Sequence, residues 1–222
     1  MDWVPFWVSF HLGLWTTSLL LVVSFPLAWV FAYSRRPWVV WVESVVTLPM
    51  VLAPTVLGFY LLLLLAPQGP LGKFFLDTFG IRLAFSFPAV VIGSCVSGLP
   101  FMVMGLKTGL LGVPPSLREA SYSLGKGRVE TFFRIVVPLM RGGLVSGVVL
   151  TFAHTMGEFG VVLMVGGSIP GVTKVISISI YEKVESLDFS TVHLYALALV
   201  MVSYPAMVLL NNLQRREPRG NR

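Results

Sequence analysis

The 222-residue chain has 55% hydrophobic and only 12% charged residues, with a mean hydropathy of +0.83. A soluble domain has about a quarter of its residues charged, so an ordinary water-soluble globule is excluded. The net charge of +6 in so apolar a chain indicates cytoplasmic loop charge rather than a nucleic-acid partner. A single cysteine, Cys95, and three widely separated histidines exclude an internal disulfide and a compact metal motif. We therefore expect an all-α integral membrane protein.

Long charge-poor runs divide the chain into membrane spans. About 20 apolar residues in an α-helix cross a bilayer core. Runs of that length predict five transmembrane helices, at 8–33, 45–66, 83–106, 142–165 and 192–210. Together they form one transmembrane domain over residues 1–213, followed by a basic tail at 214–222. A short re-entrant segment near 169–187 leaves six spans as the alternative.

The basic residues orient these spans. Twelve of the 16 lie on one side of the predicted membrane: Arg35, Arg36, Lys107, Arg118, Lys126, Arg128, Arg134, Arg141, Arg215, Arg216, Arg219 and Arg222. The other side has Lys73, Arg82, Lys174 and Lys183. The positive-inside rule therefore places the N-terminus outside and the C-terminus inside a multi-pass protein of the cell (inner) membrane. No basic segment precedes the first span, so we expect no cleaved signal peptide.

Helix-breaking and small residues recur inside the predicted spans. The prolines are Pro26, Pro49, Pro54, Pro88 and Pro100. A proline within a membrane helix is tolerated where neighbouring helices or a water-lined cavity satisfy the freed backbone groups. Glycines at small-xxx-small spacing, such as Gly143 and Gly147, have close helix packing as the simpler explanation. Taken together, the breakers favour a transport-type bundle over a simple anchor.

Polar residues inside the spans are the candidates for a translocation path. The hydroxyl residues are Thr47, Thr55, Ser97 and Thr151, each of which has hydrogen bonding to its own helix as the alternative. The predicted fourth span also contains His154 and Glu158, and a carboxylate at that depth costs several kcal/mol unless it is paired, protonated or hydrated. Their spacing of four places them on one helical face. Three roles remain open for His154 and Glu158: an interior pair that fixes helix packing, a pair that lines the pore, or a proton relay.

The segment 107–141 is long, basic and organised. Ser116 and Glu119 have the spacing of a capping box, and a short helix over 117–124 would end at Gly125. A second short helix is expected after Gly127, with Glu130 and Arg134 paired at i, i+4. Pro138 interrupts it before the fourth span. Two short helices joined by a glycine turn predict a knob that docks into another protein's groove.

The same segment carries a family resemblance. Glu119, Ala120, Ser121, Gly125, Ile135 and Pro138 match the E-A-A-x₃-G-x₉-I-x-L-P loop of ABC-importer permeases. Ser121 replaces the second alanine of that pattern, and Val137 replaces its leucine. The stretches 47–60, 157–160, 166–171 and 177–181 resemble the molybdate permease subunits of oxyanion importers. The likeness extends over about residues 14–213.

The resemblance implies partners and a division of labour. Two permease copies pair as a homodimer in the lipid bilayer, two ATP-binding subunits dock below them, and an extracytoplasmic binding protein delivers the oxyanion. The residues Glu119–Gly125 would be the ATPase-coupling element, while Arg118, Lys126 and Arg128 either contact the ATPase or are solvated loop charge. The chain has no G-x-x-x-x-G-K-[ST] motif. ATP and Mg²⁺ are therefore expected on the partner, with no cofactor and no catalysis on this chain.

The substrate is less strongly determined than the class of transporter. No basic residue lies in the predicted spans, as suits a conduit that must release its anion. Molybdate is the first expectation, followed by tungstate and then sulfate, and a permease for an amino acid or phosphate is a further alternative. A proton-coupled secondary carrier using His154 and Glu158 is the rival from another class. Five spans do not divide into the two matching halves that such carriers have.

Overall fold

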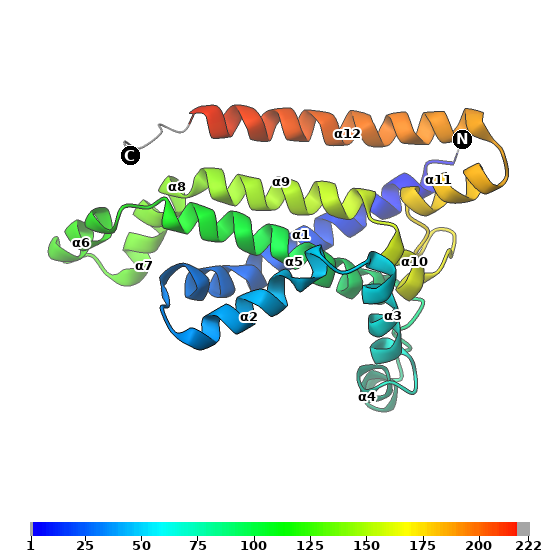
Figure 1. The fold of residues 1–222 in the computed structure, drawn as a ribbon, viewed down its shortest axis with the longest axis horizontal. Coiled ribbons are helices and arrows are strands. Elements are labelled where there is room, and N and C mark those ends of the chain that lie inside the picture. The colour runs from blue at the N-terminus through cyan, green and yellow to red at the C-terminus, as the bar shows by residue number, and fades with distance from the viewer. Residues whose placement is uncertain (1, 217–222) are drawn as a thin grey trace.

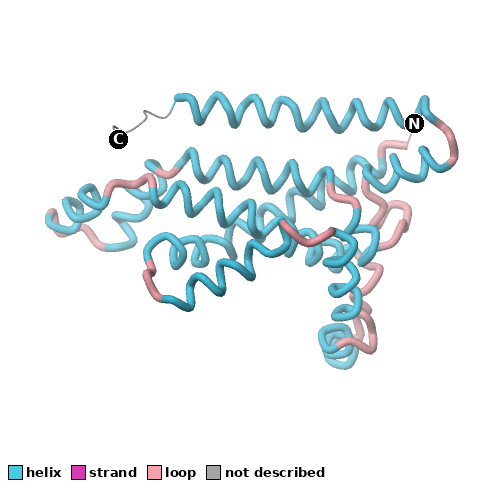
Figure 2. The backbone as a smooth tube through the Cα atoms, viewed as in Figure 1, coloured by secondary structure: helices cyan, strands magenta, loops and turns pink. Residues whose placement is uncertain are grey.

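The computed structural model describes the backbone of residues 2–216 and the side chains of residues 2–212, and all regular structure in this part of the chain is helical (Figure 2). In chain order the helices are α1 (Val4–Tyr33), α2 (Pro37–Thr47), the 3₁₀ helix η1 (Leu48–Met50), α3 (Pro54–Leu65), α4 (Pro70–Phe79), α5 (Phe87–Leu111), α6 (Pro115–Ser123), α7 (Arg128–Thr131), the π-helix η2 (Phe132–Val136), α8 (Val137–Leu139), α9 (Arg141–Gly157), α10 (Gly160–Gly166), α11 (Ile176–Glu185) and α12 (Phe189–Arg216). The predicted basic tail, 214–222, lies outside the described side chains.

The centre of the molecule is a bundle of α1, α5 and α9, and α10 packs against both α3 and α5. The short helices α6, α7 and α8 lie together at one end, and the C-terminal end of α12 lies at the same end (Figure 1). The start of α1 and helix α11 lie at the opposite end. The segments that the charge bias assigns to opposite sides of the membrane thus lie at opposite ends of the molecule.

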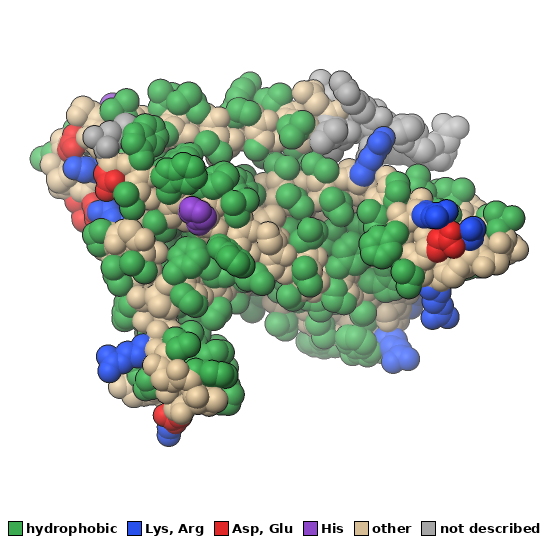
Figure 3. Space-filling model, turned by 180° about the vertical axis from the view of Figure 1, so that it is seen from behind, with side chains coloured by type: hydrophobic (Ala, Val, Ile, Leu, Met, Phe, Trp, Pro, Cys, Tyr) green, Lys and Arg blue, Asp and Glu red, His purple; other side chains and the backbone are tan. Residues whose placement is uncertain are grey.

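Four helical segments are long and apolar enough to cross a membrane: Val4–Tyr33, Pro54–Phe79, Phe87–Leu111 and Phe189–Asn212. A fifth results if the bent pair Arg128–Leu139 and Arg141–Gly157, with 70° between its halves, counts as one span. Figure 3 shows apolar side chains over most of the molecule's middle, with charged side chains gathered mainly toward its ends. The predicted all-α membrane fold with about five spans is confirmed.

Two predicted spans are not single helices. Within 45–66 the helix is interrupted between Pro49 and Pro54. The chain forms η1 and a short turn there, and α3 begins at Pro54. Proline lacks the N–H that a helix interior needs, but it is tolerated in a first turn. Within 142–165, α9 ends at Gly157 and α10 begins at Gly160. The segment near 169–187 contains the ten-residue helix α11, which is too short to be a sixth span.

Glycines bring α5 and α9 into backbone contact. A Cβ added to Gly105 would lie 2.5 Å from the Gly147 Cα, and one added to Gly143 would lie 2.4 Å from the Gly109 Cα. The two helices therefore pack through facing Gly-xxx-Gly pairs, 105/109 and 143/147. Packing of this kind needs residues without side chains. The small-residue spacing in the sequence is thus explained by helix packing.

Candidate functional site

The segment 115–139, called the coupling segment after the role that the family resemblance implies, is folded around a glycine turn. Gly125 has a left-handed backbone with φ +76°. Its N–H donates to the Tyr122 carbonyl at 2.9 Å, and the Lys126 N–H donates to the Ser121 carbonyl at 3.1 Å. These two bonds make a Schellman motif, which ends α6 and reverses the chain. The predicted capping box at the start of this helix was wrong, because α6 begins at Pro115 and has no side-chain cap.

A buried hydrogen bond joins the two halves of the coupling segment. The hydroxyls of Ser121 on α6 and Thr131 on α7 lie 2.8 Å apart, and both residues are almost fully buried. Ser121 is the position at which the chain departs from the E-A-A pattern. The departure is thus matched by a polar partner inside the same segment, and it fixes α6 against α7.

Ion pairs support the second half of the coupling segment. Glu130 lies 2.9 Å from Lys126 and 3.2 Å from Arg134, which confirms the predicted Glu130–Arg134 pair. The hydrogen bond from Lys126, with the nearby positive charges of Lys126 and Arg134, lowers the pKa of the Glu130 carboxyl below its ordinary value. Glu130 is therefore ionised at neutral pH. Lys126 thus forms its ion pair with a carboxylate of its own chain.

The coupling segment exposes several large apolar side chains among its charged ones. The exposed apolar residues are Tyr122, Leu124, Val129 and Phe133, and the exposed fraction of Leu124 is 79%. Glu119 and Ala120 are exposed beside them on α6, while Pro138 is exposed and Ile135 is half-buried. Exposed aromatic and aliphatic side chains gathered on one small projection are typical of a protein-binding surface.

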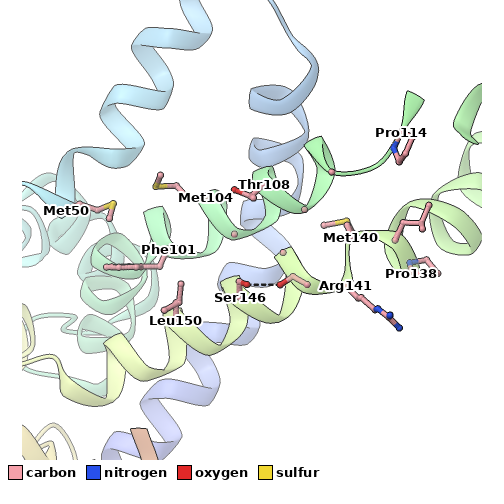
Figure 4. A pocket seen from close by; sticks show the side chains of 16 residues that line it. Met50, Phe101, Met104, Thr108, Pro114, Pro138, Met140, Arg141, Ser146 and Leu150 are labelled. Atoms are coloured by element: carbon pink, nitrogen blue, oxygen red, sulfur yellow. Dashed lines mark hydrogen bonds between the residues drawn. The ribbon is translucent and has the colours of Figure 1, made fainter. Parts of the chain in front are cut away.

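A groove of about 1180 Å³ opens between α5 and α9 at the end nearest the coupling segment (Figure 4). Its walls are mostly glycine and apolar side chains, with Thr108, Arg141 and Ser146 as the polar members; its lining includes Met50, Phe101, Met104, Gly105, Gly109, Gly142, Gly143 and Leu150. The Ser146 hydroxyl donates to the Gly142 carbonyl at 2.7 Å. The groove offers an apolar surface with few polar groups.

The predicted path residues lie elsewhere. None of the six lines the groove: Thr47, Thr55, Ser97, Thr151, His154 and Glu158. The Thr47 hydroxyl donates to the Glu43 carbonyl of its own helix, and Thr55 is exposed in the first turn of α3. Thr151 is buried on α9 with an unpartnered hydroxyl. His154 approaches the groove indirectly, because its ring stacks on that of Phe101 at 4.4 Å. A role for these residues in translocation stays a prediction.

Glu158 does not form the predicted pair with His154. Since α9 ends at Gly157 and Glu158 has an extended backbone, the two residues do not share a helical face. The Nε2 atom of His154 and the Oε2 atom of Glu158 are both buried without a hydrogen-bond partner. The Glu158 carboxyl lies instead beside the hydroxyls of Ser94 and Ser97 on α5. The spacing of four residues could not show this separation of His154 and Glu158, because it places two residues on one face only in an unbroken helix.

The opposite end of the molecule has an organised loop between α10 and α11. Two left-handed glycines, Gly167 and Gly171, turn the chain. The Thr173 hydroxyl donates to the Gly166 carbonyl at 2.7 Å, and Glu182 accepts hydrogen bonds from Lys174 and Ser168. Those two hydrogen bonds, first that of Lys174, lower the pKa of Glu182. These contacts join the loop to the end of α10 and to α11.

Phe101 and the polar residues that line the groove are not among the site residues predicted from the sequence. Thr108 and Ser146 lie about one helical turn after Gly105 and Gly143, so the two Gly-xxx-Gly pairs are the sequence signal nearest to the groove. Within residues 2–212, no three His, Cys, Asp or Glu side chains gather closely enough to hold a metal ion.

Comparison with known proteins gives consistent similarities. Residues 24–217 match the family described as "Binding-protein-dependent transport system inner membrane component". The molybdenum transport system permease protein ModB of Azotobacter vinelandii is 39% identical over 209 residues, covering 94% of this chain and 92% of that protein. ModB of Escherichia coli K12 is 36% identical, covering 82% and 81%. The sulfate transport system permease protein CysW of a Synechocystis strain is 31% identical, covering 94% and 78%.

Among solved structures, the fold resembles that of a chain in the MetNI methionine ABC transporter in an inward-facing conformation. The TM-score is 0.71 at 16% sequence identity, and the match covers 97% of this chain and 95% of that one. A chain of a bacterial ABC transporter that imports alginate matches with a TM-score of 0.64 and covers 97% and 80%. At such low identity these likenesses show the fold alone.

Proposed function

Because this chain belongs to the family of binding-protein-dependent transport system inner membrane components, we propose that it forms the membrane channel of an ATP-driven importer of molybdate. It is a multi-pass protein of the cell membrane and a non-catalytic permease subunit of an ABC importer. The observation that carries molybdate as the substrate is the 39% identity to a ModB protein over nearly the whole of both chains. The sulfate relative, at 31%, is the reason to keep sulfate and tungstate as alternatives.

The coupling segment supports the proposed ATPase partner. Its exposed apolar side chains, together with exposed Glu119 and Ala120, form a surface that a cleft in an ATP-binding subunit would cover. We propose a complex of two permease copies, two ATP-binding subunits and an extracytoplasmic binding protein. Closure of the ATP-binding subunits would draw the two coupling segments together and open the path outward. Hydrolysis, carried out by the partner, would let it turn inward.

The α5–α9 groove supports a conduit with weak affinity for its substrate. Its glycine and methionine walls offer few charged groups, and Arg141 is its one basic lining residue. A conduit must bind an anion weakly enough to release it. We therefore assign selection among oxyanions to the binding protein, which the organised loop at Gly166–Gly171 would receive at the extracytoplasmic end.

Competition uptake tests the substrate. The permease, its ATP-binding subunit and its binding protein are reconstituted in liposomes with internal ATP, and uptake of labelled molybdate is measured with excess unlabelled tungstate, sulfate or phosphate. We expect tungstate, the closest chemical match, to compete strongly and phosphate not at all. Labelled sulfate entering faster than molybdate would assign the chain to sulfate, and competition by phosphate as strong as that by tungstate would overturn the selectivity for molybdate proposed here.

A further inference from the structure

An aromatic ladder on α1 faces the coupling segment. Phe25, Trp29 and Tyr33 are spaced four residues apart, so they share one face of the helix. The rings of Phe25 and Trp29 lie 5.1 and 6.0 Å from the ring of Phe132 in η2. Trp29 in turn lies 4.8 Å from Tyr33. The cytoplasmic end of α1 is therefore in direct contact with the second half of the coupling segment.

Arg118 brings the first half of the coupling segment to the same ladder. Its guanidinium carbon lies 4.3 Å from the centre of the Tyr33 ring, which is the geometry of a cation–π contact. Unlike Lys126 and Arg134, it is in none of the ion pairs formed among the described residues. Its Nε atom is buried without a hydrogen-bond partner. Arg118 is half-buried, and its guanidinium thus lies against an aromatic ring of its own chain.

Tyr33 extends the contact to α5. Its hydroxyl donates a hydrogen bond to the Leu110 carbonyl at 2.9 Å, in the last turn of α5. The neighbouring residues Gly109 and Gly112 line the α5–α9 groove. One tyrosine side chain therefore touches α6 through its ring face and α5 through its hydroxyl, while it belongs to α1.

The covalent link between α5 and α6 is short and contains a glycine. Only residues 112–114 separate the two helices, and a Cβ on Gly112 would meet no atom closer than 3.4 Å. Val113 in this link is buried in the core, and the prolines that follow it restrict the backbone. The Arg118–Tyr33 contact is a second, non-covalent connection of α6 to the bundle, and it leads directly to α1.

We propose that Arg118 and Tyr33 are positioning residues that transmit movement of the coupling segment to α1 and α5. The inference rests on the proposed function, since it requires an ATP-binding subunit that moves α6. It assigns Arg118 an intramolecular role, in place of the two alternatives expected from the sequence, contact with the ATPase or solvated loop charge. It also assigns α1, a helix of the central bundle, an active part in opening the groove.

The test separates coupling from assembly. Arg118→Gln, Arg118→Lys, Tyr33→Leu and Tyr33→Phe are compared with wild type in the reconstituted complex, with Arg36→Gln, an exposed arginine at the same end, as control. Three quantities are measured: co-purifying ATP-binding subunit, ATP hydrolysis and molybdate taken up per ATP. We expect Arg118→Gln and Tyr33→Leu to lower uptake per ATP about fivefold, the size of one lost cation–π contact, while assembly and hydrolysis persist. Arg118→Lys should restore part of the ratio.

Tyr33→Phe tests the contact with α5 separately, because it keeps the aromatic ring and removes only the hydrogen bond to the Leu110 carbonyl. We expect a smaller fall in uptake per ATP than for Tyr33→Leu. An unchanged ratio in both Arg118→Gln and Tyr33→Leu would overturn the inference, as would a proportional loss of assembly, hydrolysis and uptake in Arg118→Gln. Failure of the wild-type complex to take up molybdate with ATP would instead refute the proposed function.

Discussion

Ser121 stands where the E-A-A pattern has its second alanine, and its hydroxyl has a buried partner in Thr131. Removing one member leaves the other buried and unpaired, which costs about 1–3 kcal/mol, whereas removing both is nearly neutral. We expect Ser121→Ala to lower the melting temperature of the purified permease by about 2–4 °C per kcal/mol lost. Thr131→Val should do the same.

A double-mutant cycle checks that interpretation. Because the hydrogen bond is lost only once, Ser121→Ala with Thr131→Val should be no less stable than either single variant. Losses that simply add in the double variant would show that the two hydroxyls act independently, and the account of this departure from the family pattern would be wrong.

Asp188 precedes α12 and caps it. Hydrogen bonds from Thr191 and then Ser190, together with the Lys183 ammonium 3.2 Å away, lower the pKa of the Asp188 carboxyl from 3.8 to about 2. A depressed pKa in the folded protein means that the stabilisation is complete above pH 4 and is lost as the pH falls toward 2. We expect the melting temperature to fall over that window, and to fall less in Asp188→Asn. Equal pH dependence in the two proteins would contradict the assignment.

At the scale of the elements, the turn after α6 depends on Gly125. A side chain there meets no atom within 4 Å, so the cost of a substitution lies in its left-handed φ, about 1–2 kcal/mol and more for a β-branched residue. We expect Gly125→Val to disrupt the Schellman turn and to lower molybdate uptake per ATP several-fold. Gly127→Val is the matched control, because Gly127 is equally open but has φ −71°. Similar effects of the two substitutions would refute the role of the turn.

The α5–α9 contact depends on glycines that face each other. Gly105→Ala would place a methyl group 2.5 Å from the Gly147 Cα, so backbone must move. Overpacking of this kind costs about 1–3 kcal/mol. We expect a lower melting temperature and reduced uptake for Gly105→Ala. Gly112→Ala, whose nearest contact would be 3.4 Å, should resemble wild type. A wild-type melting temperature in Gly105→Ala would show that the helices do not pack as described.

Composition predicted the helices better than it predicted their interruptions. The run 8–33 lies within α1, which passes through Pro26 without ending. The run 45–66 is broken at Pro49 and Pro54, and hydropathy alone could not distinguish a tolerated proline from a breaking one. The break after Gly157 was missed for the same reason, since Glu158 was assumed to continue a helix. Neighbouring helices decide these outcomes, and a single sequence does not state them.

At the scale of the whole molecule, local patterns were readable and distant contacts were not. The Gly125 turn and the Glu130–Arg134 pair follow from spacings of a few residues, and both could be predicted. The Arg118–Tyr33 contact joins residues far apart in the chain and has no sequence signature. The groove arises from two glycine pairs on separate helices, so it became visible only when α5 and α9 were placed side by side.

We propose that this membrane protein moves molybdate by ATP hydrolysis in a partner rather than by a proton gradient. The most direct measurement is uptake of labelled molybdate into proteoliposomes containing the permease, its ATP-binding subunit and its binding protein, with and without internal ATP and a protonophore. We predict uptake that requires ATP and the ATP-binding subunit and is unaffected by the protonophore. Uptake that is indifferent to ATP and abolished by the protonophore would contradict the account.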